Sequence, residues 1–332
     1  MNRVLHYWQR YSLALTIVSI LLIFFGGYEW LGRGFYQGQS QLSQTTVLIP
    51  KGLSLHKLSM LLEEKKVIPS WIIFEVNVRL RRNSSKIKAG EYLFLSSRTP
   101  ASVMLQMIEG RTVKRRITII EGLKNKEIIK ILMTAEGLEG DIVNIPEQGY
   151  LMPETYYYSY HDSRQAVLER MHEAMFDALE KAWNTRKPDL PLKDPREAII
   201  LASIVEKETA LGYERPRVAA VFLNRLKKNM PLQADPTVSY GLEKAYGKTL
   251  ERPLNRNDLT ILTPYNTYMI QGLPPEPICN PGLASLKAVL NPMATADLYF
   301  VANGEGGHTF SPNYKEHQKH HQKLRALRKK EK

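Results

Sequence analysis

Residues 199–209 read Ile199-Ile200-Leu201-Ala202-Ser203-Ile204-Val205-Glu206-Lys207-Glu208-Thr209, an almost wholly apolar run that ends in two carboxylates. Such a run predicts a buried helix. A strong start signal precedes it, because Asp194 can cap the helix, Pro195 suits the first helical position and Glu197 suits the third. Burying an ionised carboxylate is costly, so each carboxyl group here must be paired, exposed in a cleft or protonated.

The two carboxylates of this helix are expected to differ. Glu208 lies over Ile204 and Val205, one turn back, and near the helix C-terminus, where the dipole disfavours negative charge. Both effects raise the pKa of Glu208, which is the direction that a general acid needs. Glu206 lies about 200° from Glu208 around the helix axis, over smaller and more polar residues, and is predicted to be structural. The helix alone also leaves open that neither glutamate is catalytic. The arginines that could pair with Glu206 are Arg215, Arg217 and Arg225.

Composition narrows the class of protein. The chain has 332 residues, a formal charge of +13 and one cysteine, which excludes a disulfide scaffold. The charge implies attraction to an anionic membrane surface, polymer or nucleic acid. No motif of interleaved aromatic and basic residues is present, so we expect no nucleic-acid partner. The chain has neither a Gly-rich phosphate loop nor Cys and His at metal-binding spacings, so we predict no cofactor and no metal site.

The N-terminus predicts a membrane anchor. Residues 11–28 contain no charged residue and are mostly Leu, Ile, Val and Phe, a length that can span a bilayer. Arg3 and Arg10 precede the run, which favours a cytoplasmic N-terminus. A cleaved signal peptide is the alternative, but the run lacks an Ala-x-Ala-like cleavage site. We therefore predict residues 1–31 as a cytoplasmic tip and transmembrane helix, with the rest of the chain outside the cytoplasm.

A small lobe is predicted after the anchor. Residues 32–44 are rich in Gly, Gln and Ser and are typical of a linker. Residues 45–97 predict the order strand, helix, helix, strand, with Ser54 and Ser70 preceding the helices. This order resembles LysM, a small glycan-binding fold, and a spacer without a ligand is the alternative. With its connecting elements, the LysM-like lobe covers residues 45–122.

Residues 123–314 are predicted as a catalytic lobe of mixed α/β structure around the buried helix. A long amphipathic helix is expected over residues 163–183 and a short strand over residues 298–302. Beyond Gln233 the chain is rich in Pro, Gly, Asn and Tyr, which favours long irregular loops that carry binding groups. The predicted fold class is therefore α+β, with an N-terminal transmembrane helix.

Residues 315–332 form a basic tail, with eight Lys or Arg and two Glu. Such a tail is either solvated or in contact with an anionic polymer or lipid. Its histidines, His317, His320 and His321, have spacings that could touch a metal, but histidines in a basic tail are more often surface residues, and we interpret them so.

Three polar clusters in the predicted loops suit sugar hydroxyls and acetamido groups. The first, residues 232–240, contains Asp235-Pro236, which is typical of a turn. The second is Tyr265-Asn266-Thr267-Tyr268 with the Gly and Pro residues that follow it, and the third is residues 304–310. Each alone is ordinary loop chemistry, but together they favour polysaccharide binding. The predicted glycan-binding residues are Gln233, Asp235, Thr237, Tyr240, Asn266, Tyr268 and His308.

The order of these motifs resembles a known family. They are Gly149-Tyr150-Leu151-Met152-Pro153-Glu154-Thr155-Tyr156, Glu206-Lys207-Glu208-Thr209, Leu232-Gln233-Ala234-Asp235-Pro236-Thr237-Val238, Tyr265-Asn266-Thr267-Tyr268, Gly272-Leu273-Pro274-Pro275 and Gly306-Gly307-His308-Thr309-Phe310. Over essentially the whole chain, they resemble the MltG (YceG-like) endolytic murein transglycosylases.

The resemblance implies a bacterial inner-membrane enzyme that cuts peptidoglycan strands internally, near peptidoglycan synthases, and leaves 1,6-anhydromuramic ends. In that family the second Glu of the Glu-Lys-Glu-Thr motif is the catalytic acid, which is Glu208 here and agrees with the helix argument. The neighbouring Thr209 resembles the hydroxyl residue that helps to orient the acid in other lytic transglycosylases. Glu154 stands where some members carry Asp, which keeps the charge.

Two other functions also fit the residues. A lysozyme-like hydrolase would need a second acid near the cleft, and Asp235 and Glu154 are the candidates. A non-catalytic glycan-binding scaffold would depend on the LysM-like lobe, with Glu208 as a satisfied structural carboxylate. The products distinguish the hydrolase, because hydrolysis leaves a reducing end.

Overall fold

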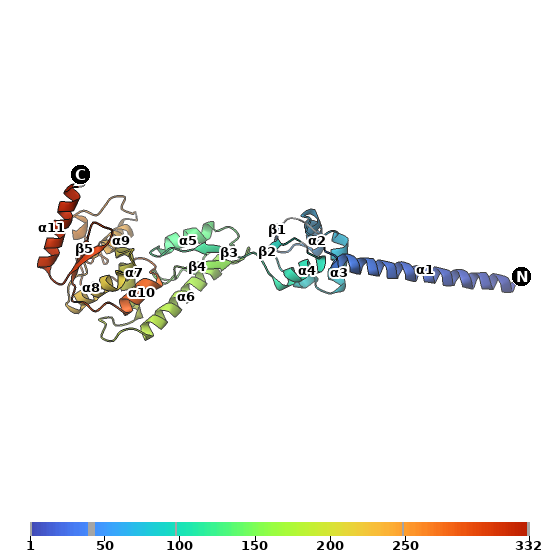
Figure 1. The fold of residues 1–332 in the computed structure, drawn as a ribbon, viewed down its shortest axis with the longest axis horizontal. Coiled ribbons are helices and arrows are strands. Elements are labelled where there is room, and N and C mark those ends of the chain that lie inside the picture. The colour runs from blue at the N-terminus through green and yellow to red at the C-terminus, as the bar shows by residue number, and fades with distance from the viewer. Residues whose placement is uncertain (1, 39–43, 97, 248, 331–332) are drawn as a thin grey trace. The chain divides into compact units, whose positions relative to one another are not determined.

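The structure, a computed structural model, describes residues 2–38, 44–96, 98–247 and 249–330. The chain forms two compact units, which Figure 1 shows as ribbons: residues 1–115 with residues 159–161, and residues 116–158 with residues 162–332. Both units contain helices and short strands, which confirms the mixed helix and strand class that the sequence predicts.

A single long helix, α1 (Asn2–Tyr36), begins the first unit. Its segment Leu13–Tyr36 has the length and the hydropathy to cross a membrane, so α1 fits the predicted single-pass anchor. The prediction that a linker starts at residue 32 is wrong, because α1 continues to Tyr36 and Phe35 is fully buried in the core of the unit. Residues 39–43 of that predicted linker lie outside the described residues, as do the side chains of Arg3 and Arg10.

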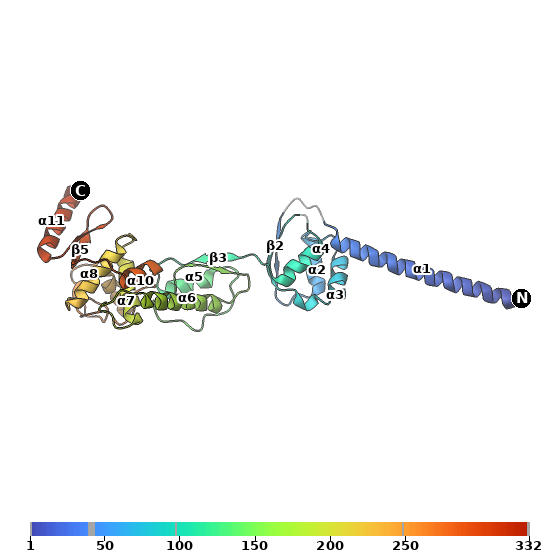
Figure 2. The same ribbon diagram turned by 60° about the horizontal axis from the view of Figure 1, so that its bottom comes forward.

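The remainder of the first unit has the predicted order of strand, helix, helix and strand. Its elements are β1 (Thr45–Ile49), α2 (Leu55–Glu64), α3 (Trp71–Leu80), a 3₁₀ turn (η1, Ser84–Lys86), β2 (Gly90–Phe94) and α4 (Pro100–Glu109). Figure 2 shows helices α2, α3 and α4 beside strand β2. The strands pair antiparallel, with Thr45 opposite Phe94. The hydroxyls of Ser54 and Ser70 accept backbone N–H groups in the first turns of α2 and α3, which confirms the predicted helix starts.

The core of the first unit lies between this two-stranded sheet and the helices. Leu62, Phe74, Tyr92 and Phe94 have no exposed surface, and the rings of Tyr92 and Phe94 stack at 5.9 Å. The element order thus matches the sequence expectation, while the likeness of the lobe to LysM stays a prediction.

The second unit is larger and mainly helical. Its elements are β3 (Arg115–Thr118), α5 (Asn125–Thr134), β4 (Thr155–Tyr158), α6 (Arg164–Asn184), α7 (Pro195–Glu208), α8 (Arg215–Lys227), α9 (Asp235–Tyr246), a 3₁₀ turn (η2, Asp258–Thr260), α10 (Leu283–Leu290), β5 (Tyr299–Ala302), β6 (His308–Ser311) and α11 (Tyr314–Lys330). Strand β3 pairs with β4, and β5 pairs antiparallel with β6.

Helix α7 lies in the middle of the core of the second unit. Every residue from 198 to 205 is buried, and α6, α8, α9 and α10 all pack against the helix. The side chain of Asp194 accepts the backbone N–H of Glu197 at 2.9 Å, and Pro195 is the first helical residue. The predicted buried helix and its start signal are confirmed.

Two stretches beyond Gln233 are helical where long irregular loops are predicted. Helix α9 begins at Asp235 with Pro236 in its first turn, and α10 follows later in the chain. Proline in a first turn loses no hydrogen bond and already has a helical φ, so Asp235-Pro236 starts a helix here and the predicted turn is wrong. Residues 249–282 are irregular as predicted, apart from η2.

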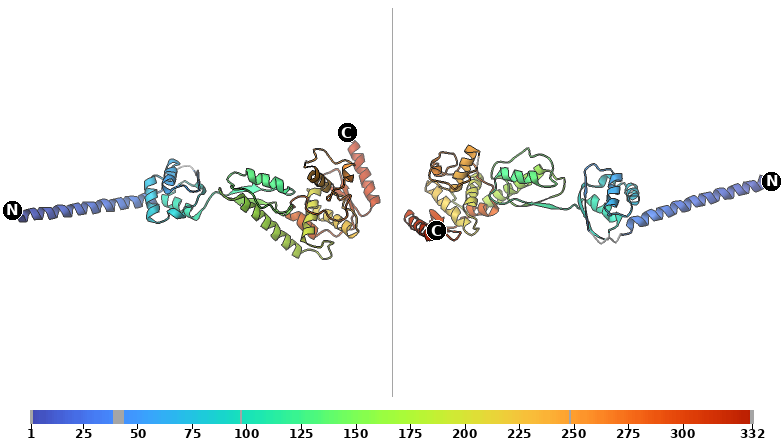
Figure 3. Two further views of the ribbon diagram at one scale, coloured as in Figure 1. Left: turned by 180° about the vertical axis from the view of Figure 1, so that it is seen from behind. Right: turned by 90° about the horizontal axis from the view of Figure 1, so that it is seen from above.

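The basic tail forms α11, which packs against β5 and β6 and lies at the edge of the second unit (red in Figure 3). His317 is not the surface residue that the sequence suggests. Its ring stacks on Tyr299 at 5.1 Å, and its Nδ1 is buried with no hydrogen-bond partner in the part of the chain that the structure describes. Burial, helped by the charges of His321 and Arg225, lowers the pKa of His317. Residues 331–332 of the tail lie outside the described residues.

Candidate active site

The carboxyl group of Glu208 has no partner among the described residues. Glu208 is the last residue of α7 and is partly exposed, and no described group hydrogen-bonds to it or forms an ion pair with it. Burial raises the pKa of Glu208 to about 8; the negative charge of Asp235 also raises it and the positive charge of Arg225 lowers it. Glu208 is therefore largely protonated at neutral pH, in the direction that its helix position predicts.

Glu206, two residues earlier, is paired at both carboxylate oxygens. Its Oε1 accepts a hydrogen bond from Nη2 of Arg215 at 2.9 Å, and its Oε2 accepts the backbone N–H of Gly282 at 2.9 Å. Arg215 also donates to Glu121 at 3.1 Å. The side chain of Glu206 is only 4% exposed. Of the three arginines considered as its partner, Arg215 forms the ion pair.

Asp235 and Tyr268 lie in the electrostatic surroundings of Glu208. Asp235 is exposed at the start of α9, and the hydroxyl of Tyr268 donates to its Oδ1 at 2.7 Å. The pKa of Tyr268 is raised, first by burial, then by Asp235 and Glu208. Because charges interact appreciably only over short distances in a partly solvated site, these residues belong to one cluster. The structure thus brings together residues from α7, from α9 and from the loop after η2.

Arg225, on α8, supplies the positive charge of this cluster. Its guanidinium, 8% exposed, donates to the backbone carbonyls of Leu232 and Leu298 and to Oε1 of Gln233 at 3.2 Å. The described bonds of Arg225 all go to neutral acceptors, so its charge is not cancelled by a bonded carboxylate and acts on Glu208. Gln233, exposed and with a positive φ of 51°, is thereby held at the edge of the cluster.

A chain of polar contacts joins the residue after Glu208 to the β5–β6 hairpin. The hydroxyl of Thr209 donates to Oε2 of the buried Glu214 at 3.3 Å, and not to Glu208 as the resemblance suggests. The Nδ1 of His308 lies 2.7 Å from the same Oε2, and the backbone N–H of His308 donates to Oε1 at 2.8 Å. Burial opposes the charge of Glu214, but the hydrogen bonds from His308 outweigh it and lower the pKa of Glu214. Glu214 therefore holds His308 next to the end of α7.

Thr237 and Asn266, both expected to bind glycan, have no exposed surface. The hydroxyl of Thr237 donates to the backbone of Ala234 at 2.6 Å and lies 2.9 Å from Oγ1 of Thr267. The amide of Asn266 donates to two backbone carbonyls of the preceding loop, at 3.0 and 2.8 Å. These contacts support a structural role, in which both residues shape the loops that carry Asp235 and Tyr268.

A hollow of about 410 Å³ lies beside Asp235. Tyr240, Ser239 and Lys207 also line it, and Lys207 directly precedes Glu208. The hydroxyl of Tyr240 donates to Glu276 at 3.2 Å, and its ring meets that of Tyr265 edge to face at 5.0 Å. Aromatic and polar side chains around a hollow suit a sugar ring with its hydroxyls.

Glu154 lies elsewhere in the second unit. It is exposed and lines a different hollow of about 690 Å³, formed mainly by side chains of α6 and α10. The two hollows share no lining residue. The structure therefore gives Glu154 no contact with the Glu208 cluster.

The sequence does not single out Glu214, and it suggests Arg225 only as a partner of Glu206, whereas the charge of Arg225 acts on Glu208. Glu214 meets His308 from 94 positions away, a separation that no local pattern reveals. One signal was present in the motif Gly306-Gly307-His308, because a Cβ on Gly307 would lie 2.8 Å from Oε1 of Glu214. The glycine thus marks a close approach, although the sequence does not name the group that approaches.

The fold and the site define a protein suited to acid catalysis, because a carboxyl group with a raised pKa ends a buried helix and a polar hollow lies nearby. The chain belongs to the YceG-like family, whose model matches residues 47–323.

Curated relatives and a solved structure agree with this family. The chain is 32% identical to an endolytic murein transglycosylase of Bacillus subtilis, over 87% of this chain and 89% of that protein. It is 27% identical to an endolytic murein transglycosylase of Streptococcus pneumoniae, over 82% of this chain and 56% of the longer relative. A crystal structure of a putative YceG-like protein from Listeria monocytogenes is similar with a TM-score of 0.50 and 31% identity, covering 83% of this chain and 99% of that one.

Proposed function

We propose that this protein is an endolytic peptidoglycan lytic transglycosylase in which Glu208 is the general acid and then the general base. The observation that carries the proposal is the carboxyl group of Glu208 at the end of α7, which pairs with none of the described residues and whose pKa is raised to about 8. The names of the relatives, endolytic murein transglycosylases, support the substrate and the class of reaction. A lyase of this kind needs one carboxylate that can both give and take a proton.

The reaction begins when Glu208 gives its proton to the oxygen that links N-acetylmuramic acid to N-acetylglucosamine. The bond from C1 of the muramic residue to that oxygen breaks, and the acetamido group of the substrate stabilises the positive charge at C1. The ionised Glu208 then removes the proton of the muramic 6-hydroxyl, whose oxygen closes on C1. Glu208 is protonated again, no water is consumed, and the strand ends in a 1,6-anhydro ring.

The surroundings of Glu208 suit both halves of this cycle. Burial and the charge of Asp235 favour the protonated acid before cleavage, whereas Arg225 favours the carboxylate that waits for the second step. Glu214 binds Nδ1 of His308, so the orientation of the imidazole is fixed and Nε2 remains for the substrate. The residues that we propose to position the glycan are Gln233, Asp235, Tyr240, Tyr268 and His308.

We further propose that α1 anchors the enzyme in the bacterial cytoplasmic (inner) membrane, with the N-terminus inside and the chain after α1 outside. Its length and hydropathy support the anchor. An anchored enzyme meets glycan strands close to where they are made, so peptidoglycan synthases are the proposed partners. The LysM-like lobe is proposed to help retain the strand.

Mass spectrometry of purified glycan strands, treated with the full-length protein in detergent, tests the function. Internal fragments with anhydromuramic ends are expected from the natural protein and not from a folded Glu208→Gln variant. A Glu154→Gln variant is the control, because its carboxyl lies outside the Glu208 cluster. Strands left intact by the natural protein, or cut equally by the Glu208→Gln variant, would overturn the proposal.

A lysozyme-like hydrolase is the second candidate, and one observation favours it. Asp235 is close enough to raise the pKa of Glu208, so a second carboxylate is present near the acid. Glu154, the other carboxylate considered for this role, is not in the cluster. Reducing ends in the same experiment would select the hydrolase and make Asp235 its base or nucleophile.

A further inference from the structure

Helix α3 is apolar on two sides. Ile73, Phe74 and Val78 are buried in the unit. On another side, Ile72, Val76 and Leu80 form an apolar stripe at intervals of four residues, and Ile72 and Leu80 are 45% and 65% exposed. A surface helix ordinarily turns charged residues to the solvent, and a helix that is apolar all round is ordinarily covered. Among the described residues of the first unit, none covers Ile72 or Leu80 enough to bury it.

Helix α1 continues without a loop into the first unit, where its last turns contact α3. Phe35 is fully buried, and the side-chain amide of Asn77 donates to the backbone carbonyl of Leu31 at 3.2 Å. Gly34 lies so close to α3 that a Cβ there would be 2.7 Å from Ile73. The last turns of α1 are therefore packed directly against α3.

Arg81, the residue after α3, binds two aromatic residues at the end of α1. It donates to the hydroxyl of Tyr36 at 3.0 Å, and its guanidinium lies 4.9 Å from the centre of the Phe35 ring. Figures 1 and 2 show α3 on the side of the first unit from which α1 projects. A membrane in which α1 is inserted is thus next to α3.

The distance along α1 places α3 at the level of the lipid headgroups. Residues 11–28 are the charge-free part of the helix, and the contacts with α3 begin at Leu31. With a rise of about 1.5 Å per residue, Leu31 to Phe35 lie ~5–10 Å beyond that part. The headgroup layer on each side of a bilayer is ~5–8 Å thick.

The apolar stripe also points in the required direction. Phe74 and Val78 face the core, and Ile73 and Asn77 face α1. At 100° per residue, the stripe lies on the side of α3 opposite the core. Because α1 runs from the bilayer toward the core, the side of α3 away from the core is the side nearest the bilayer.

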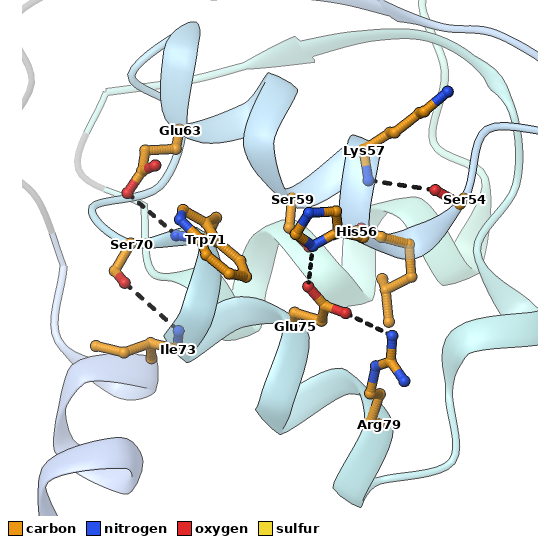
Figure 4. A network of polar contacts seen from close by, with 11 residues as sticks. Ser54, His56, Lys57, Ser59, Glu63, Ser70, Trp71, Ile73, Glu75 and Arg79 are labelled. Carbon is orange, nitrogen blue, oxygen red and sulfur yellow. Dashed lines mark hydrogen bonds and ion pairs between the residues drawn. The ribbon is translucent and has the colours of Figure 1, made fainter.

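The charges of this region complement an anionic surface. Arg82 follows the end of the stripe, and residues 32–115 contain fourteen Lys or Arg against five Glu and no Asp. The acidic residue of α3, Glu75, is neutralised inside the lobe. Figure 4 shows its carboxylate between His56, at 2.9 Å, and Arg79, at 2.5 Å. Glu75 thus presents no uncompensated negative charge to lipid.

We propose that α3 is an interfacial helix that rests on the outer surface of the bilayer, with the stripe Ile72, Val76 and Leu80 between the headgroups and Arg82 on anionic phosphates. The proposal rests on α1 being the anchor but not on the chemistry of Glu208. Its consequence is that the first unit is held against the membrane by α1 and α3 together.

Lipid quenching in the full-length protein tests the contact. An Ile72→Cys variant and a Met60→Cys variant are labelled with an environment-sensitive fluorophore and reconstituted in vesicles that contain brominated phospholipid. The two positions are matched, at 45% and 49% exposed, and Met60 belongs to α2, outside the stripe. Cys279 is fully buried and does not compete for the label. We expect quenching at position 72 to exceed that at position 60 several-fold.

Two further variants separate the stripe from Arg82. In the Ile72→Cys background, Leu80→Glu should abolish most of the excess quenching, whereas Leu105→Glu on α4, which alters an apolar residue 49% exposed outside the stripe, should not. Arg82→Glu, or vesicles without anionic lipid, should reduce it. Co-flotation with the vesicles shows separately that α1 is inserted, and no glycan cleavage is needed. Equal quenching at positions 72 and 60 in floating protein would overturn the proposal.

Discussion

Glu206 and Glu208 lie two residues apart on one helix, in opposite surroundings. Glu206 is almost fully buried and has partners at both oxygens, from Arg215 and Gly282. Glu208 is partly exposed, has no described hydrogen-bond partner, and carries a raised pKa of about 8. The difference comes from the groups that neighbouring segments supply, the start of α8 and the residue before α10, and not from α7 itself. A paired carboxylate stabilises the fold, whereas an unpaired one is retained at a cost that function explains.

The largest expected effect comes from removing the titrating group of Glu208. Glu208→Gln keeps the size of the side chain but cannot deliver and recover a proton, so the cleavage rate should fall about 10²- to 10⁴-fold, or ~3–5 kcal/mol in activation free energy. The rate of anhydromuramic product release measures it. Glu206→Gln, assayed where it is still folded, should lose far less. Comparable losses in both variants would remove the functional distinction between the two carboxylates.

The second effect concerns stability and falls on Glu206. Glu206→Gln leaves the buried Arg215 with only one carboxylate partner, Glu121. The free energy of unfolding should therefore fall by roughly 3 kcal/mol, which is the low end of the range for a broken buried ion pair. Chemical denaturation measures it. Glu121→Gln is the matched control: that side chain is 41% exposed, and its loss should cost less than about 1 kcal/mol. A neutral Glu206→Gln variant would show that the pair does not stabilise the fold.

Glu208→Gln should act on stability in the opposite direction. A carboxyl whose pKa is raised in the folded state favours folding fully below its unfolded pKa, and this contribution is lost as the pH rises toward about 8. Above that pH, the Gln variant should therefore be more stable than the natural protein by about 2 kcal/mol, with little difference near pH 4. The full rise of the pKa from 4.5 to about 8 is equivalent to about 5 kcal/mol, and solvent screening of the partly exposed carboxyl reduces this value. Unfolding curves at several pH values test this. A variant less stable than the natural protein at every pH would contradict the destabilised acid.

Helices with clear start signals could be predicted from the sequence. So could the difference between the two glutamates, a raised pKa for Glu208 and a structural role for Glu206. The buried run 198–205, the cap at Asp194 and the apolar turn under Glu208 are all local features. The partners could not be predicted, because they come from distant segments: Gly282 meets Glu206 across 76 positions, and His308 meets Glu214 across 94. Local patterns give the propensity of a segment, whereas tertiary contacts decide which polar groups are satisfied.

The loops were the least predictable part of the candidate site. Asp235-Pro236 suits a turn and a helix start equally well, and packing of α9 against α7 selects the helix. Thr237 and Asn266 have side chains of the kind that bind sugars, but these side chains donate their hydrogen bonds to nearby backbone carbonyls. Composition shows that polar groups are plentiful, and only the fold shows which of them remain available.

The smallest expected effect distinguishes the charge of Asp235 from its hydrogen bond. The negative charge of Asp235 helps to raise the pKa of Glu208, so Asp235→Asn should lower that pKa and move the alkaline fall in activity to lower pH, by up to about one unit. Tyr268→Phe is the matched control, because it removes the 2.7 Å hydrogen bond but keeps the charge, and it should leave the alkaline limb in place. The pH profile of the rate separates the two. If Asp235→Asn instead abolishes cleavage at every pH, Asp235 takes part in the chemistry, and the hydrolase becomes the better reading of the site.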